Sequence, residues 1–152
     1  MCDTFLQISA SIGISASPDR GGSLGEISGK KGSHKFGQST FTLAYYNTIK
    51  AFHWHKKQDD LWFISSGKAY VVLYDYRKKS KTFSFKQIIS AGKNNYKLIL
   101  IPKGVCHGYK VVSKEPVSLF YHTTESYDIH NPDEYRIPYD SKEIGIDWDS
   151  LK

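Results

Sequence analysis

The chain has 152 residues, is 39% hydrophobic and 14% aromatic, and carries a formal net charge of +6. Such a chain is long enough to bury a core and too apolar to be disordered. No apolar run approaches the ~20 residues that a membrane helix needs, and the first residues do not resemble a signal peptide. We therefore expect one globular domain over residues 1–152, located in the cytoplasm and not bound to a membrane.

The distribution of charge and cysteine excludes further classes. Lys and Arg are scattered over turn-like stretches such as 30–35, 56–57 and 77–81, and no helix-turn-helix, zinc-finger or RNP pattern occurs. The sequence therefore does not predict a nucleic-acid partner. Cys2 and Cys106 form no CxxC pair, so we expect free thiols and not a disulfide framework.

The predicted elements are almost all strands. Residues 19–33 are rich in Gly and Ser and indicate short strands joined by turns. From residue 41 onward, β-branched and aromatic runs alternate with turn residues. Strands at this spacing predict an all-β sandwich or barrel, whose interior can surround a ligand. The predicted strands are Phe41–Tyr46, Ile49–Trp54, Leu61–Ser65, Lys68–Tyr76, Thr82–Ile89, Tyr96–Ile101, His107–Ser113 and Val117–Thr124.

Strand alternation predicts which side chains share a face. Because successive side chains of a strand point to opposite faces, His53 and His55 share one face, and Phe52 and Trp54 share the other. The same alternation predicts two further groups, which are His107 with Tyr109 and Val111, and Tyr121 with Val117 and Leu119.

Two segments carry a recognisable motif. The first contains His53, His55 and Asp60 and ends at Gly67, and the second runs from Pro102 through Gly104 to His107. Together they resemble the two motifs of the cupin superfamily, with Asp60 where the first motif has Glu and the P-x-G-x-x-H of the second matched in full. The resemblance implies a double-stranded β-helix, or cupin jelly roll.

A narrower resemblance covers residues 18–148. The order and spacing of the matching residues are similar to those of the dTDP-4-dehydrorhamnose 3,5-epimerase family. That resemblance implies an isomerase that inverts carbons next to the 4-keto group of a dTDP-linked 6-deoxy sugar in deoxysugar or polysaccharide biosynthesis, without a cofactor. The matching stretches are Asp19-Arg20-Gly21 with Glu26, Phe36–Thr40, Lys50–His53, Ile101–Gly104, His107–Tyr109, Leu119–Tyr121, Thr123–Thr124, Tyr127, Glu134, Ile137, Tyr139–Asp140 and Ile144–Trp148.

The resemblance also implies roles for single residues. His53 falls at the family's base, which takes the α-proton, and Tyr121 falls at the acid that returns a proton to the opposite face of the sugar ring. Imidazole exchanges protons well near neutral pH, and phosphates favour Arg and Lys. His107 is expected to line the pocket. The expected nucleotide-binding residues are Arg20, Gln38, Lys50, Tyr127 and Glu134, of which the last two could equally be structural, and a homodimer is implied.

Three departures from the family keep other functions open. Asp60 stands where the family has an enolate-stabilising Lys, His55 replaces a Gln, and the sequence reaches Lys152 before the Asp that orients the base. One alternative is a metal-dependent cupin with Fe, Mn, Ni or Zn on His53, His55, Asp60 and His107. Another is a catalytically silent protein that binds a nucleotide sugar. The His53–Lys57 run is also similar to the dTDP-4-keto-6-deoxyglucose 3,4-ketoisomerases, and Asp60 could instead be a solvent-exposed strand start.

Overall fold

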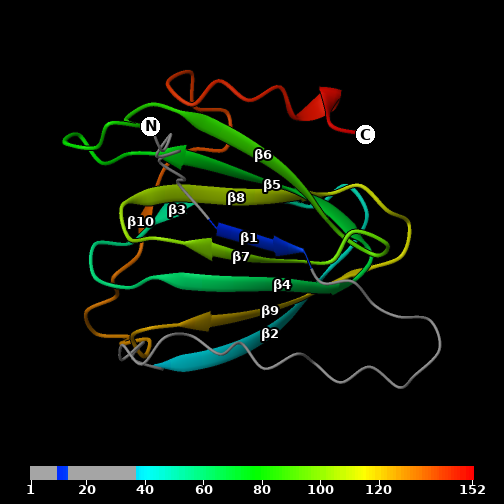
Figure 1. Ribbon diagram of the computed structural model, residues 1–152, viewed down its shortest axis with the longest axis horizontal. Helices are drawn as coiled ribbons and strands as arrows, with labels where there is room; N and C mark the ends of the chain where they lie inside the picture. The colour runs from blue at the N-terminus through cyan, green and yellow to red at the C-terminus, as the bar shows by residue number, and fades with distance from the viewer. Residues whose placement is uncertain (1–9, 14–36) are drawn as a thin grey trace, which may run out of the picture.

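The computed structural model describes residues 10–13 and 37–152. Within these residues it contains ten strands and one short 3-10 helix, arranged as two antiparallel five-stranded sheets (Figure 1). The strand order is β1-β7-β4-β9-β2 in the first sheet and β10-β3-β8-β5-β6 in the second. The bounds are β1 Ala10–Gly13, β2 Gln38–Ala44, β3 Ile49–Trp54, β4 Asp60–Ser66, β5 Lys68–Asp75, β6 Lys86–Gly92, β7 Lys97–Ile101, β8 Val105–Val111, β9 Val117–Thr123, β10 Tyr135–Arg136 and η1 Trp148–Ser150.

The main core fills the space between the two sheets. On β5, Val71 and Leu73 face this core, whereas Val72 and Tyr74 belong to a second cluster on the outer face of the same sheet. This is the period-two alternation of a strand, here with apolar residues on both faces because both faces are covered. The predicted grouping of Tyr109 with Val111, and of Tyr121 with Val117 and Leu119, is confirmed by their places in or against the main core.

The C-terminal segment covers the outer face of the second sheet (Figure 1). Trp148 packs on Phe52 with ring centroids 5.4 Å apart, and its indole N–H donates to the Tyr139 carbonyl at 2.8 Å. The buried Lys110 donates to the Trp148 carbonyl at 2.6 Å. These contacts pack the C-terminal segment against the outer face of β3, opposite the face that carries His53. No helix within residues 10–13 and 37–152 is long and apolar enough to cross a membrane.

The predicted strands are confirmed to within a few residues, except for one. The run Thr82–Ile89 was expected to be a strand throughout, but β6 begins only at Lys86. Residues 81–84 form a turn instead, because Thr82 Oγ1 donates to Asp75 at 2.5 Å and Ser84 adopts a φ of 64°. The Gly- and Ser-rich stretch 19–33 lies outside the described residues.

Asp75, which is completely buried, and Arg77, whose side chain is 35% exposed, form an ion pair at the end of the molecule that carries the site. Asp75 accepts two hydrogen bonds from the Arg77 guanidinium, both at 2.8 Å. The Arg77 stem packs against Gly104, where a Cβ would lie 2.5 Å from the Arg77 Cγ and where φ is +78°. Gly104 in turn donates to the His55 carbonyl at 2.7 Å. A glycine at this position therefore permits the positive φ of the turn after β7 and leaves room for the Arg77 side chain.

Candidate active site

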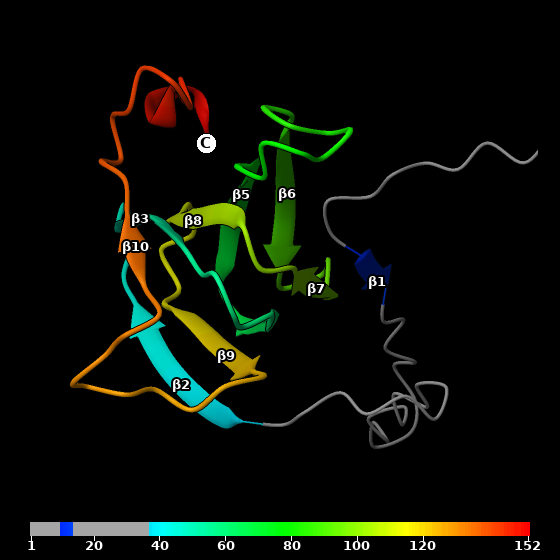
Figure 2. The ribbon, with the colours of Figure 1, turned by 90° about the vertical axis from the view of Figure 1, so that its left-hand side faces the viewer.

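A cavity of about 1300 Å³ opens between the two sheets at the end formed by β3, β4 and β9. Most residues of the stretch 125–139, which contains β10 and the connection that leads to it from β9, contribute to one wall. Figure 2 shows this connection beside β2, β9 and β3. Most of the predicted site residues line this one cavity. They are Gln38, Lys50, His53, His55, Asp60, Tyr121, Tyr127 and Glu134, whereas Arg20 lies outside the described residues.

An irregularity in β3 aims His53 into the cavity. The register between β3 and β8 shifts between Lys50 and His53. On the other edge of β3, Phe52 exchanges backbone hydrogen bonds with Ile137, which continues the pairing of β3 with β10. His53 and His55 both line the cavity, and Phe52 packs in the outer cluster with Trp54 against it, which confirms the predicted alternation. A β-bulge of this kind commonly redirects a side chain at a site.

His53 meets two other imidazole rings edge-on. Its ring centroid is 4.1 Å from that of His107 and 5.2 Å from that of His55. Burial and then the charges of His107 and His55 lower the pKa of His53, and Asp60 raises it by a smaller amount. The resulting pKa is about 2. The free imidazole is therefore neutral and has a lone pair available for a proton.

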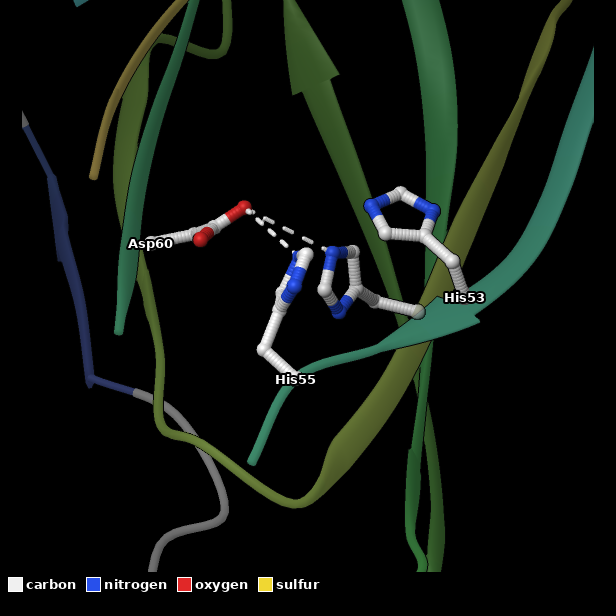
Figure 3. A group of neighbouring side chains, drawn as sticks. His53, His55 and Asp60 are labelled. Atoms are coloured by element: carbon white, nitrogen blue, oxygen red, sulfur yellow. Dashed lines mark ion pairs between the residues drawn. The ribbon is translucent and has the colours of Figure 1, made fainter. Parts of the chain in front are cut away.

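His53, His55, Asp60 and His107 form a tight group whose potential ligand atoms all lie within 4.8 Å of one another. Figure 3 shows three of these side chains, His53, His55 and Asp60. Asp60 Oδ2 lies 3.6 Å from His107 Nε2 and 3.9 Å from His55 Nε2. Burial raises the pKa of Asp60, but the neighbouring His107, His55 and Trp62 lower it more, so that it stays below its usual value. Asp60 is therefore a carboxylate in a buried position.

Two expectations for this group need correction. His107 was expected to line the pocket, but it is only 1% exposed and is not among the lining residues, because His53 and Trp62 lie over it. The alternative of a solvent-exposed Asp60 is also wrong, since Asp60 is 2% exposed. Gln58 Nε2 and Trp62 Nε1 donate to its carboxylate at 2.9 and 3.2 Å and fix its orientation.

Tyr121 reaches the cavity from the opposite sheet. It belongs to β9, whereas His53 belongs to β3, and its ring packs against Trp62 with centroids 6.4 Å apart. Tyr109 is its buried neighbour, and no group within the described residues hydrogen-bonds the Tyr109 hydroxyl. Burial, with a smaller contribution from Tyr121, raises the pKa of Tyr109 to about 12. His53 and Tyr121, the two candidate proton-transfer residues, therefore belong to different sheets on opposite sides of the cavity.

The predicted nucleotide-binding residues gather at the rim. Gln38 Oε1 accepts from the Tyr127 backbone N–H at 3.0 Å, and Lys50 Nζ donates to Thr42 Oγ1 at 3.2 Å. Glu134 pairs with Arg136 at 2.7 Å. These contacts tie the 125–139 wall to β2 and supply two cations near the opening.

Sequence reasoning missed two residues of this site. Arg136 lines the cavity and pairs with His53 in the register of β10 and β3, and its charge two residues after Glu134 was the available signal. Asp133 accepts from the backbone N–H groups of residues 56–58, and its own carbonyl accepts from His55 Nδ1. Nothing in its local sequence marks Asp133, because these partners come from a distant loop.

Comparison with known proteins gives a consistent result. The Bacillus subtilis (strain 168) spore coat polysaccharide biosynthesis protein SpsL is 50% identical over 115 residues, 76% of each chain. The probable low-salt glycan biosynthesis epimerase Agl13 of Haloferax volcanii is 34% identical, over 74% of this chain and 72% of that protein. The crystal structure of a dTDP sugar isomerase from Desulfovibrio desulfuricans G20 superposes with a TM-score of 0.75 at 25% identity, covering 96% of this chain and 92% of that one.

These similarities confirm the predicted jelly-roll fold and the predicted class of enzyme, an epimerase-like isomerase of nucleotide-linked sugars. A family model described as dTDP-4-dehydrorhamnose 3,5-epimerase matches residues 25–152. With a match over most of its length and a relative at 50% identity, the chain belongs to the dTDP-4-dehydrorhamnose 3,5-epimerase family.

Proposed function

We propose that this protein epimerises a carbon next to the 4-keto group of a dTDP-linked 6-deoxy sugar, with His53 as the base and Tyr121 as the acid. The observation that carries the proposal is the placement of these two side chains on different sheets around one cavity. An inversion needs a proton taken from one face of the ring and returned to the other. Two groups on opposite walls meet that need.

The proton balance requires no redox partner. His53 takes the α-proton, and the C–H electron pair enters the enolate of the 4-keto group. The Tyr121 hydroxyl then gives its proton to the opposite face of the same carbon, and solvent resets both groups. Because no electrons are gained or lost, we propose that the reaction uses no redox cofactor.

The neutral state of His53 fits the role of proton acceptor. Burial and the neighbouring imidazoles hold its pKa at about 2 in the free protein. A bound nucleoside diphosphate brings negative charge into the cavity, which raises the pKa of a nearby imidazole. Binding of the substrate therefore makes His53 a stronger base at the stage where it is needed.

The rim is suited to the nucleotide. Lys50 and Arg136 are exposed cations that line the cavity, and Arg binds phosphate oxygens in a planar, two-pronged geometry. Gln38 and Tyr127 are joined by a hydrogen bond and present an amide and an aromatic ring beside them. We assign the diphosphate to the two cations and the base to Gln38 and Tyr127.

We also propose that the protein is a homodimer that pairs through the outer face of β2 and β9. Phe41 and Leu43 on β2 are 50% and 48% exposed, and Phe41 packs on the exposed Phe120 of β9 at 4.8 Å. Within the described residues β2 is the edge of its sheet. Exposed apolar side chains next to an unpaired strand edge favour association with a second copy.

Solvent exchange tests the proposed reaction. The protein is incubated in D₂O with dTDP-4-keto-6-deoxyglucose, and deuterium at C3 and C5 is followed by NMR and mass spectrometry. We expect deuterium to enter with the wild-type protein and His53→Asn to slow entry by about 10²–10⁴-fold. His130→Gln, which changes an exposed histidine that does not line the cavity, is the matched control.

The same experiment separates the remaining alternatives. If dTDP binds in a direct titration but no deuterium enters, the protein is a silent nucleotide-sugar-binding protein and the proposal fails. A product with its keto group at C3 would instead identify a 3,4-ketoisomerase. A wild-type rate that His53→Asn leaves unchanged would remove His53 as the base.

A further inference from the structure

The hydroxyl of Tyr109 is a buried polar group that lacks a partner in the protein. Tyr109 is 3% exposed, and its hydroxyl oxygen has no hydrogen-bond partner within residues 10–13 and 37–152. Buried hydroxyls are almost always hydrogen-bonded, because an unpaired one has given up water without compensation. Since Tyr109 also lines the cavity between the sheets, a ligand in that cavity can supply the partner.

The backbone and the ring of Tyr109 are held in place. The residue lies on β8, which has a neighbour on each side, and it pairs with Lys50 of β3 and Val71 of β5. Its ring meets the indole of Trp62 edge-on, with centroids 5.8 Å apart. These contacts position the hydroxyl before a substrate arrives, and a donor fixed in advance is effective at stabilising charge that develops during a reaction.

Tyr109 lies between the proposed base and the proposed acid. It follows His107 by two residues on β8, so both side chains share the inner face, and the ring of His53 packs on that of His107. Trp62 contacts the rings of both Tyr109 and Tyr121. An enolate carries its negative oxygen on the carbon next to the one that exchanges its proton. A donor placed between the base and the acid is suited to that oxygen.

The hydroxyl of Tyr109 keeps its proton at neutral pH. Burial, with a smaller contribution from Tyr121, raises the pKa of Tyr109 to about 12. A protonated phenol donates a hydrogen bond to an anion, whereas a phenolate would repel it. Tyr121 is more exposed than Tyr109, so solvent can restore a proton to Tyr121 after each turnover. The two tyrosines therefore suit different tasks.

Position 60 leaves the enolate without the cation that the family resemblance predicts. Asp60 is 2% exposed, and its neighbours hold its pKa below the usual value, so it is a buried carboxylate. A negative group opposes the formation of an oxyanion. The proposed reaction therefore calls for another donor, and the Tyr109 hydroxyl is protonated, fixed and unpaired.

We propose that Tyr109 is a catalytic residue whose hydroxyl donates a hydrogen bond to the 4-oxygen of the enolate. This assignment rests on the proposed epimerisation and adds the group that stabilises its intermediate. His53 takes the α-proton, the C–H electron pair moves onto the 4-oxygen, and the O–H bond of Tyr109 stays intact. When Tyr121 gives its proton to the carbon, the carbonyl forms again and the hydrogen bond from Tyr109 weakens.

The stability of the free protein gives a first test without any sugar. Tyr109→Phe removes only the hydroxyl and keeps the ring on Trp62. Because the hydroxyl has no partner among the described residues, we expect the melting temperature to stay the same or to rise. A clear fall would show that the hydroxyl has a structural partner in the protein, which would overturn the assignment.

Deuterium exchange in D₂O with dTDP-4-keto-6-deoxyglucose gives the second test. Loss of one donor to an oxyanion lowers kcat by about 10²–10³-fold, so we expect this fall in Tyr109→Phe with little change in KM. Tyr74→Phe is the matched control, because Tyr74 is also 3% exposed but lies in the outer cluster and does not line the cavity. It should exchange deuterium like the wild type.

The carbonyl of the bound substrate reports the hydrogen bond directly. The substrate is labelled with ¹³C at C4 and bound to His53→Asn, which lacks the proposed base, and the C=O stretch is measured by isotope-edited infrared spectroscopy. We expect a lower frequency in His53→Asn than in the double variant His53→Asn/Tyr109→Phe, because a donor weakens the C=O bond.

The outcomes distinguish this assignment from the proposed function. Exchange by the wild type that Tyr109→Phe leaves unchanged would overturn the role of Tyr109 and leave the epimerisation standing. The same holds for a C=O frequency that is equal in the single and the double variant, or for a change confined to KM. A wild-type protein that exchanges no deuterium would overturn the proposed function and this assignment together.

Discussion

Asp60 Oδ2 lies 3.6 Å from His107 Nε2, and both side chains are almost completely buried. The family resemblance predicts a lysine at position 60, so a negative charge occupies the place of a positive one. The structure compensates for this exchange locally, because two imidazoles and an indole N–H surround the carboxylate. The pair therefore shows how the fold surrounds the carboxylate that departs from the family pattern.

Replacement of the proposed acid should separate proton removal from inversion. Tyr121→Phe keeps the ring on Trp62 but removes the hydroxyl that returns the proton. We expect deuterium still to enter the α-carbon through His53, while formation of the inverted product falls by about 10²–10⁴-fold. Both are read from one NMR time course. Equal loss of exchange and inversion would contradict the division of roles between the two residues.

Removal of the Arg136 guanidinium should weaken substrate binding. Arg136→Ala deletes a guanidinium at the cavity rim, where Glu134 is its only charged partner among the ion pairs of the described residues. A hydrogen bond to a charged group contributes about 1.5–3 kcal/mol, which predicts a rise in KM of about 10- to 100-fold. Steady-state kinetics checks this, with Lys79→Ala, an exposed charge outside the cavity, as the control. A fall in kcat at constant KM would argue against a binding role.

The ion pair between Asp75 and Arg77 should make the free energy of unfolding depend on pH in the acid range. Burial raises the pKa of Asp75, but Arg77, Thr82 and Ser80 lower it more, so the folded pKa lies well below the usual ~3.9. A depressed carboxyl pKa stabilises the fold above the unfolded value, and the stabilisation is lost as the pH falls towards the folded value. We expect the free energy of unfolding to decrease below about pH 4.

A matched pair of variants assigns this acid effect. Asp75→Asn should lower the free energy of unfolding by about 1.5–3 kcal/mol at pH 7, since it replaces the charged hydrogen bonds between Asp75 and Arg77 by weaker neutral ones. It should also flatten the dependence between pH 5 and 3 that urea titrations measure. Asp140→Asn, an exposed carboxylate, should leave both unchanged. An equally steep acid dependence in Asp75→Asn would show that other carboxyls are responsible.

Charge on the outer face of β2 should prevent dimerisation. Phe41→Glu places a carboxylate on the apolar face that includes Leu43 and Phe120. Light scattering and sedimentation should give a dimeric mass for the wild type and a monomeric mass for the variant. Phe85→Glu changes a phenylalanine with similar exposure outside this face and should remain dimeric. A wild-type protein that is monomeric at all concentrations would exclude the proposed pairing.

Several features could be predicted from local sequence because they depend on local geometry. Alternation along the strand placed His53 and His55 on the inner face, and the structure confirms it. The error at Thr82–Ile89 shows the limit of that reasoning. The sequence 82–85 has strand-like aromatics, yet the buried Asp75 accepts from Thr82 and converts the stretch to a turn. A hydrogen bond to Asp75, seven residues earlier in the chain, overrode the local preference.

The sequence by itself determined the all-β fold, the family and the set of histidines with Asp60, since these follow from strand periodicity and motif spacing. Only the tertiary structure decided how the set is arranged. The Asp133 carbonyl accepts from His55, which lies 78 residues away in the sequence, and β10 brings Arg136 beside His53. His107 is buried against the ring of Trp62. Such contacts depend on which strands become neighbours and in which register, because burial and orientation are properties of the packed sheets and not of any one segment.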